Sequence, residues 1–444
     1  MDTALDNFNT GFKQKLLSGI VWRALNVLFA FIFNALFVRQ MGAASSGTFF
    51  YLLNNLFFAI LFLSAGLESG ISYYNARKEQ SSSYFFSLSL AWTFTATVLF
   101  FFIIHVIPQE VLPIEGKYQF LTLYVFGSML NGFLSAIYFT NHDSKTPNIL
   151  AAFTNILLIL LLPDMPWINR SISFELYVNI YLCAVLFSPV ILSAFLLIKK
   201  VQFLVPFYKA PSLRPLFLFS FHSFIIGLLF NLLKSSDYWL VKKWCTISDA
   251  GNYYQASKIM QLLLLIPTMA SFSLYPLIVQ SIQKNERNNE QSATIERVLK
   301  LVGLYFFIAV FLSVAIIVAG YWIFPFLYGI SFSNMYLATL LLIPGLIFFA
   351  ASYPLTIFFS GKKQNITTII FLTVAIVVML FCNIILTPRF FIYGAAISSS
   401  VANILYFGLL FNKFLIQNNL PLNEKTLRSL YKNTAILKSL ISIK

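Results

Sequence analysis

The sequence predicts an all-α, polytopic membrane protein with about twelve transmembrane helices, because it is very apolar, its apolar residues come in long runs, and its charges are mostly positive. Of the 444 residues, 59% are hydrophobic and 10% are charged, whereas about 25% of a soluble chain is charged. A soluble fold with this composition would expose large apolar patches and aggregate. Despite the net charge of +15, the composition excludes a soluble nucleic-acid-binding domain, a disordered protein and a disulfide scaffold.

The apolar runs give the individual helices. A helix needs about 20 mostly apolar residues to cross the hydrocarbon layer. Twelve runs are candidates, and the fifth is the shortest. They lie at approximately 16–38, 49–74, 84–107, 118–140, 148–163, 175–198, 216–241, 252–279, 298–327, 336–360, 366–387 and 392–416.

The distribution of positive charge predicts the orientation. With the N-terminus inside the cell, 21 of the 30 Lys and Arg residues fall on inner segments, six fall on outer loops and three lie within helices. Inner loops of membrane proteins carry an excess of Lys and Arg. We therefore expect both termini in the cytoplasm and an even number of spans.

The longest inner linkers divide the chain. Residues 1–198 form an N-terminal lobe with spans one to six, 199–215 a cytoplasmic linker, and 216–416 a C-terminal lobe with spans seven to twelve. The tail, 417–444, carries Leu427, Leu430, Ile436, Leu437, Leu440 and Ile441 among five cations. It is either an amphipathic helix on the inner leaflet or a disordered polar tail.

The two lobes contain an internal repeat. After the first span of each lobe, a cation at the outer end is followed by a small-residue turn, a glycine and an aromatic pair. These residues are Arg39, Gly47, Phe49 and Phe50 in the first lobe, and Lys242, Gly251, Tyr253 and Tyr254 in the second. Six spans separate the copies, so the lobes share one orientation, as in parallel-repeat transporters.

Seven stretches of the sequence together form a recognisable pattern: 17–23, 39–42, 236–241, 250–259, Pro267, 275–276 and 393–398. They resemble the corresponding segments of a known family, the polysaccharide and O-antigen flippases of the multidrug, oligosaccharidyl-lipid and polysaccharide exporter superfamily. The similarity extends over nearly the whole chain in span count and order.

This resemblance implies a MATE-like fold, with two six-helix lobes around a central cavity and alternating access. It implies that an undecaprenyl-pyrophosphate-linked oligosaccharide, an O-antigen (lipopolysaccharide) or capsular repeat unit, moves across the bacterial cytoplasmic (inner) membrane. The implied partners are this lipid-linked oligosaccharide, membrane lipids and the polysaccharide polymerase machinery, and not nucleic acid. Proton or Na⁺ coupling is expected, without another cofactor.

Three cations lie within predicted spans: Arg23 in span one, Lys234 in span seven and Lys258 in span eight. A charge at the bilayer centre costs about 2.5–3.5 kcal/mol on insertion scales, although these side chains can also reach toward an interface. Each cation shares a helical face with other polar side chains. These are Asn26 and Asn34 beside Arg23, Asn231 beside Lys234, and Gln255 beside Lys258. Polar stripes predict that these helices line a hydrated interior between the lobes.

A cavity with more cations than acids predicts an anionic ligand. Pyrophosphate offers several oxygens for charge-assisted hydrogen bonds. Arg23 would bind as a bidentate fork, and Lys234 and Lys258 as point charges. Our hypothesis is that Arg23 meets the headgroup from the inward-open side, while the two lysines hold or release it nearer the outside.

Glu68 in span two and Asp237 in span seven allow two interpretations. They can neutralise nearby cations, since Asp237 follows Lys234 by three residues, a spacing that permits an ion pair, and Glu68 neighbours Arg23. Alternatively, one of them binds a coupling proton or Na⁺ and competes for the cationic site.

Two alternatives remain. A cation-coupled multidrug exporter has the same fold, but its first span usually carries an acid where this chain has Arg23. A membrane glycosyltransferase or polymerase needs a large outer loop with carboxylates, and the outer loops are short. Because the sequence contains no metal-ligand spacing, P-loop or nucleophile motif, we expect no catalytic residues, no metal and no enzyme activity.

Overall fold

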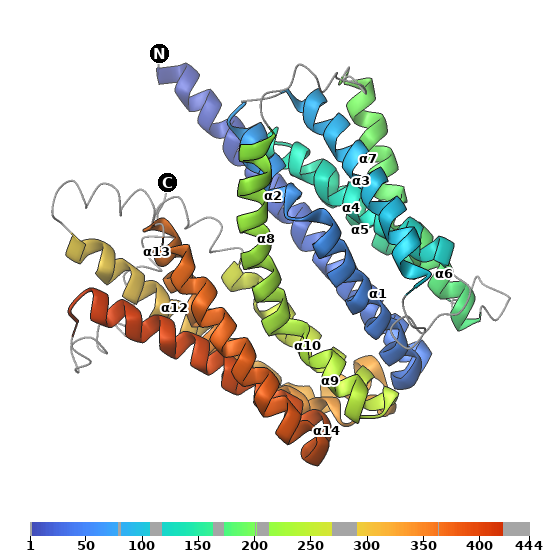
Figure 1. The fold of residues 1–444 in the computed structure, drawn as a ribbon, viewed down its shortest axis with the longest axis vertical. Helices are drawn as coiled ribbons and strands as arrows, with labels where there is room; N and C mark the ends of the chain where they lie inside the picture. Colours follow the sequence, from blue (N-terminus) through green and yellow to red (C-terminus); the bar gives the residue numbers. More distant parts are fainter. Residues whose placement is uncertain are drawn as a thin grey trace. The chain divides into compact units, whose positions relative to one another are not determined.

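The computed structural model consists of helices throughout its described residues, with no strand among them (Figure 1). The described residues are 2–78, 81–106, 118–162, 173–199, 201, 213–268, 291–362 and 364–420. Most of the predicted linker and of the predicted tail lies outside them.

The chain forms two compact units, Met1–Leu228 and Leu229–Lys444, here called the N-terminal and C-terminal units. The N-terminal unit contains α1 (Asp2–Ser64), α2 (Leu67–Ala76), α3 (Ser82–Ile104), α4 (Tyr118–Thr140), α5 (Lys145–Leu160), α6 (Phe174–Ala184) and α7 (Phe187–Ile198). The boundary falls within α8 (Arg214–Ser235). The C-terminal unit continues with α9 (Asp237–Trp244), α10 (Ile247–Leu263), α12 (Gln291–Tyr328), the 3₁₀ turn η2 (Ile330–Phe332), α13 (Met335–Gly361) and α14 (Asn365–Gln417).

These helices account for the predicted spans. Within the part of the chain that the structure describes, eight helical segments are long and apolar enough to cross a membrane. The segment 21–64 has 44 residues and turns at Gly42, whose φ of 72° is left-handed, so it contains the first span and most of the second. Helix α14 has 53 residues and turns at Phe391, so it contains the last two spans. The prediction of an all-α, multi-pass membrane protein with about twelve helices is confirmed.

Span two is broken where α1 ends. Ala65 and Gly66 both have positive φ, at 48° and 71°. A break leaves helix carbonyls without intrahelical partners, and here the Trp92 indole donates to the Leu63 carbonyl at 2.9 Å. Gly66 is required by sterics as well as by φ, because a Cβ there would lie 2.2 Å from the Ser220 carbonyl oxygen.

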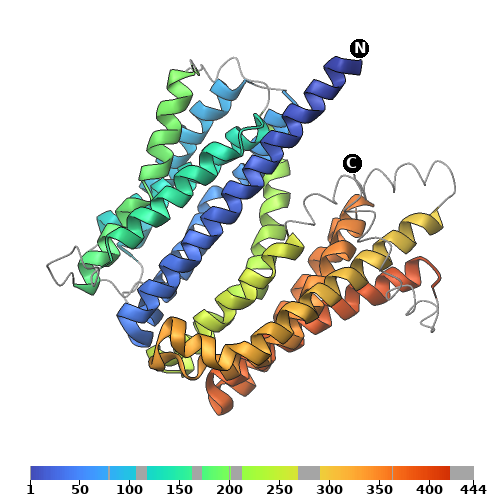
Figure 2. The same cartoon turned by 180° about the vertical axis from the view of Figure 1, so that it is seen from behind.

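The N-terminal unit has an aromatic core. Helix α1 packs along α5, and α4 packs against α2, α3 and α7 (Figures 1 and 2). Phe37 is fully buried, and its ring centroid lies 4.7 Å from that of Phe49 and 5.6 Å from that of Tyr177. The Tyr177 hydroxyl donates to the Leu158 carbonyl at 3.1 Å, so this buried polar atom is satisfied.

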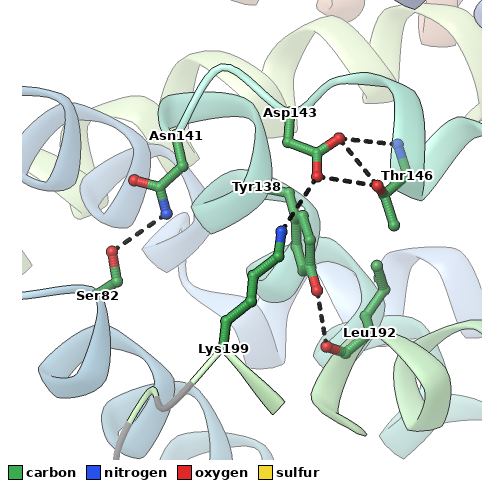
Figure 3. A network of polar contacts seen from close by, with 7 residues as sticks. All are labelled: Ser82, Tyr138, Asn141, Asp143, Thr146, Leu192 and Lys199. Carbon is green, nitrogen blue, oxygen red and sulfur yellow. Dashed lines mark hydrogen bonds and ion pairs between the residues drawn. The ribbon is translucent and has the colours of Figure 1, made fainter. Parts of the chain in front are cut away.

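A polar network joins one end of α4, α5 and α7 in the same unit (Figure 3). Asp143 accepts hydrogen bonds from the Thr146 amide and hydroxyl at the start of α5. Its Oδ2 also lies 3.6 Å from Lys199 Nζ, just after α7. The buried Tyr138 hydroxyl donates to the Leu192 carbonyl at 3.0 Å. The network therefore ties three helices through side chains from their ends.

The C-terminal unit is built around α13, which packs against α14, α12 and α10. Its contact with α14 is close at Gly345, whose amide donates to Ser400 Oγ at 3.3 Å. Large apolar side chains on α12 face outward, including Phe311, Trp322 and Phe326, each more than two-thirds exposed. Such a surface suits a helix in contact with lipid.

Candidate functional site

The predicted residues of the N-terminal unit lie along α1. Arg23 is exposed, and no described carboxylate lies within ion-pair distance of it. Asn26 Oδ1 accepts a hydrogen bond from Asn155 Nδ2 of α5 at 2.9 Å. Asn34 is half-buried. Asn26 therefore contributes to the contact between α1 and α5, while Arg23 remains accessible.

Glu68 lies in the first turn of α2, and its residue is exposed. It makes no ion pair with Arg23, so the expected neutralising pair is not formed. The carboxylate instead lies beside Gly132 of α4, where an added Cβ would come within 3.4 Å of Glu68 Oε2.

Asp237 is the centre of a buried polar cluster in the C-terminal unit. Its residue is 2% exposed. Its Oδ2 accepts hydrogen bonds from Tyr253 Oη of α10 at 2.5 Å and from Ser399 Oγ of α14 at 2.6 Å. The other oxygen, Oδ1, is buried and has no hydrogen-bond partner among the described residues. Three helices thus meet at one carboxyl group that has an unused oxygen.

This cluster borders a cavity of about 50 Å³. Its lining is Leu233, Lys234, Asp237, Ser257, Met260, Gln261, Leu264, Leu342, Leu346, Phe349, Ser399 and Asn403. One water needs roughly 10–15 Å³ in this measure, so the cavity accommodates a few waters or a small cation. It is too small for a pyrophosphate with an attached sugar.

Lys234 lines the cavity together with Asp237, but the two do not pair. No ion pair within 4 Å joins them, and Lys234 Nζ lies 5.5 Å from the centroid of the Phe349 ring. The intrahelical pair that the three-residue spacing permits is therefore not formed. The hydroxyls of Tyr253 and Ser399, from neighbouring helices, hold the carboxyl group through Oδ2, and the Lys234 ammonium lies over the Phe349 ring instead of at Oδ1.

The other predicted residues of this unit lie outside the cavity lining. Lys258 is half-buried, with Nζ 5.9 Å from the centroid of the Tyr254 ring. Gln255 is fully buried, and neither polar atom of its amide has a hydrogen-bond partner among the described residues. Asn231 is half-buried. Of the predicted residues, the cavity brings together only Lys234 and Asp237.

Two members of the cluster, Tyr253 and Ser399, were missed as site residues in the sequence. Tyr253 was visible only as one of the aromatic pair in the repeat. Ser399 is the middle of three consecutive serines within the apolar run of the last span. Consecutive hydroxyls at that depth need partners, and this signal points to the region.

Solved structures share this fold. A multidrug resistance MATE family transporter of the MOP superfamily matches with a TM-score of 0.70 and 14% identity, over 94% of this chain and 99% of that chain. The lipid II flippase MurJ matches with a TM-score of 0.68 and 15% identity, over 96% and 91%. A MOP superfamily transporter from Pyrococcus furiosus, described as having a binding pocket of reverse polarity, matches with a TM-score of 0.62 and 13% identity, over 92% and 95%.

No protein-family model and no curated protein sequence matches this chain. At 13–15% identity, the similarity to the solved structures concerns the fold. The chain has the all-helical fold of the MATE transporters and of the lipid II flippase.

Proposed function

We propose that this protein flips an undecaprenyl-pyrophosphate-linked oligosaccharide, such as an O-antigen or capsular repeat unit, across the bacterial cytoplasmic membrane by alternating access. The observation that carries the proposal is the excess of cations over acids within the membrane helices of both units. A lipid flippase among the solved structures of this fold supports it. We also propose that both termini are cytoplasmic and that a polysaccharide polymerase receives the product.

The cations suit a diphosphate. The exposed guanidinium of Arg23 can bind two phosphate oxygens at once. Lys234 and Lys258 are half-buried, lie near aromatic rings and form no ion pair with a described carboxylate, so their ammonium groups retain capacity for an anionic ligand. Asn34, Asn231 and Gln255 provide neutral polar side chains on the same helices. None of these cationic and neutral polar side chains is proposed as a nucleophile or a metal ligand, so the role that we propose for them is substrate binding.

Asp237 is the proposed coupling site for a proton or Na⁺. A buried carboxylate without a counter-charge is strongly destabilising. The Tyr253 and Ser399 hydroxyls provide hydrogen bonds to Oδ2 but no positive charge. A proton or a small cation at Oδ1 would supply it, and the adjacent cavity has room for one. Glu68 is the second candidate, although its exposure makes a bound cation less necessary.

The test is deletion in the producing bacterium, followed by measurement of lipid-linked oligosaccharide in the inner leaflet. We expect accumulation there, loss of surface glycan, and restoration of both by the wild-type gene. Arg23→Ala and Lys258→Ala should fail to restore export although the protein reaches the membrane. The matched control is Lys413→Ala, which removes a cation of α14 outside the proposed site. Normal export by both site variants would refute the proposal.

A cation-coupled multidrug exporter is the second candidate, because a transporter of that class shares the fold and because Asp237 is buried. The excess of cations argues against cationic drugs, which such a site repels. Unchanged drug susceptibility of the deletion strain, with accumulation of lipid-linked glycan, would distinguish the flippase from the exporter.

A further inference from the structure

The cavity of the C-terminal unit contains a positive and a negative side chain that do not neutralise each other. Lys234 and Asp237 are the charged members of its lining, and the remaining lining residues are neutral. No other charged side chain of this lining lies between the Lys234 ammonium and the Asp237 carboxyl group or competes with either of them.

Both groups have neutral partners in the structure. Asp237 Oδ2 is held by two hydroxyls, and its Oδ1 is unpartnered among the described residues. Lys234 Nζ lies over the Phe349 ring. A buried carboxylate left beside an unpaired ammonium is an unfavourable arrangement. Once a proton or cation neutralises Asp237, Lys234 is no longer attracted to it, and the ammonium then needs another anionic partner.

The helices packed against α9 supply no competing charge at this position. Helix α10 contributes Tyr253, whose hydroxyl binds Oδ2, and α14 contributes the neutral Ser399. The cavity-lining residues of α13 are apolar or aromatic. Lys258 of α10 lies near Tyr254 and is not part of the lining. The charge state of Asp237 is therefore set by its own proton or cation and by Lys234.

We propose that Lys234 and the coupling cation are alternative partners of Asp237 Oδ1, so that cation binding releases Lys234 to hold the pyrophosphate of the substrate. This inference rests on the proposed function. With the cation bound, the ammonium is available to the ligand. When the cation leaves, Lys234 pairs with Asp237 and gives up the ligand. Lysine suits this exchange because it carries a point charge on a flexible stem.

Tyr253 and Ser399 are positioning residues in this scheme. By occupying Oδ2, they leave Oδ1 as the oxygen for which the cation and the ammonium compete. The scheme fixes the sign of the coupling. Cation and anionic ligand strengthen each other's binding, and linkage requires this effect to be reciprocal. If Asp237 competed with the ligand for Lys234 but bound no cation itself, the affinity for the ligand would not depend on the cation.

The test measures binding of inorganic pyrophosphate to the purified full chain in lipid nanodiscs by calorimetry, with Na⁺ or choline as the cation at constant ionic strength. We expect the wild type to bind on the order of tenfold more tightly in Na⁺, which corresponds to about one charge-assisted hydrogen bond. Asp237→Asn should bind tightly in both salts, since the neutral amide imitates an occupied carboxyl group. Lys234→Gln should bind weakly in both.

The matched control is Lys413→Gln, which removes a cation of the same unit outside both the cavity and the proposed site. In this background, Asp237→Asn should still strengthen pyrophosphate binding in choline, whereas in the Lys234→Gln background it should have no effect. If the cation is a proton, Na⁺ has no effect, and the advantage of Asp237→Asn over the wild type grows with pH. Because Asp237→Asn and the wild type are compared at the same pH, the protonation of pyrophosphate itself affects both affinities equally.

Two results would overturn the inference. The first is that Asp237→Asn changes the pyrophosphate affinity equally with and without Lys234. The second is that the pyrophosphate affinity of Lys234→Gln still depends on the cation. The second comparison needs no Asp237 variant, so it holds if that variant fails to fold. Ser399→Ala should reduce the cation dependence and Ser399→Thr should restore it. Absence of pyrophosphate binding by the wild type would refute the proposed function itself, whereas binding with additive mutational effects would refute only the exchange.

Discussion

Replacing Gly345 with alanine should force α13 and α14 apart. A Cβ built on Gly345 would lie 2.5 Å from Ser400 Cα and 2.9 Å from Ser400 Oγ. Since non-bonded carbons pack at about 3.5–4.0 Å, the α14 backbone would have to retreat by roughly 1 Å. This retreat also lengthens the hydrogen bond from the Gly345 amide to Ser400 Oγ and the one from Ser400 Oγ to the Leu341 carbonyl.

The expected destabilisation is about 1–3 kcal/mol from overpacking plus about 0.5–1.5 kcal/mol for a weakened hydrogen bond. At about 2–4 °C per kcal/mol for a unit of 150–250 residues, the melting temperature should fall by roughly 3–18 °C. Because Ser399 precedes Ser400 on α14, the same movement withdraws a hydroxyl from Asp237. Export should therefore fall together with stability.

The assay is fluorescence-detected size exclusion after heating the detergent-solubilised protein. The matched control is Gly408→Ala, also on α14, where an added Cβ has no neighbouring atom within 4 Å. Alanine is favoured over glycine in a helix by about 1 kcal/mol, so this variant should melt at or slightly above the wild-type temperature. Equal melting temperatures for Gly345→Ala and the wild type would refute the argument from the close helix contact.

Three further predictions concern other parts of the chain. Burial raises the pKa of the Cys245 thiol to about 12, so in a variant with this single cysteine, maleimide labelling at pH 8 should be slow and should accelerate as the pH rises toward that value. Tyr138→Phe removes a buried hydrogen bond and should lower the free energy of unfolding by about 1 kcal/mol (Figure 3). Lys199→Ala breaks a largely exposed ion pair and should lower it by less than about 1 kcal/mol, so equal shifts of the melting temperature would contradict this ranking. Asn26→Ala should cost about 0.6–1.7 kcal/mol, because it removes the hydrogen bond from Asn155. Asn155→Ala also removes a bond to the Ala151 carbonyl, so the double variant should cost no more than Asn155→Ala alone; additive melting shifts would show that the two side chains act separately.

The fold was predictable because membrane spans are long and carry a strong local signal. Runs such as 298–327 and 336–360 correspond to α12 and α13, since an apolar run of that length has few alternatives to a membrane helix. The positions of the helix breaks were harder to predict. Ala65 is an ordinary helix former, and the break at its position is accompanied by contacts with residues distant in the sequence, Trp92 at the Leu63 carbonyl and Ser220 at Gly66.

The site was only partly predictable for the same reason. Asp237 and Lys234 were visible because charges are rare in membrane helices. Their spacing suggested an ion pair, and the structure shows that this pair is not formed. The hydroxyls that hold Asp237 come from Tyr253, 16 residues later, and Ser399, 162 residues later. Local spacing cannot identify partners that only the packing of α9, α10 and α14 brings together.

The break in span two has a consequence for how this protein can change during evolution. The Leu63 carbonyl is satisfied by an indole from another helix, and the next residues adopt a conformation that disfavours side chains larger than glycine. Trp92 and Gly66 therefore depend on each other, because both maintain the same helix break. Replacing Gly66 would bring a side chain against the Ser220 carbonyl, and losing Trp92 would leave the Leu63 carbonyl unsatisfied in the membrane. Related sequences with this break should therefore retain both residues.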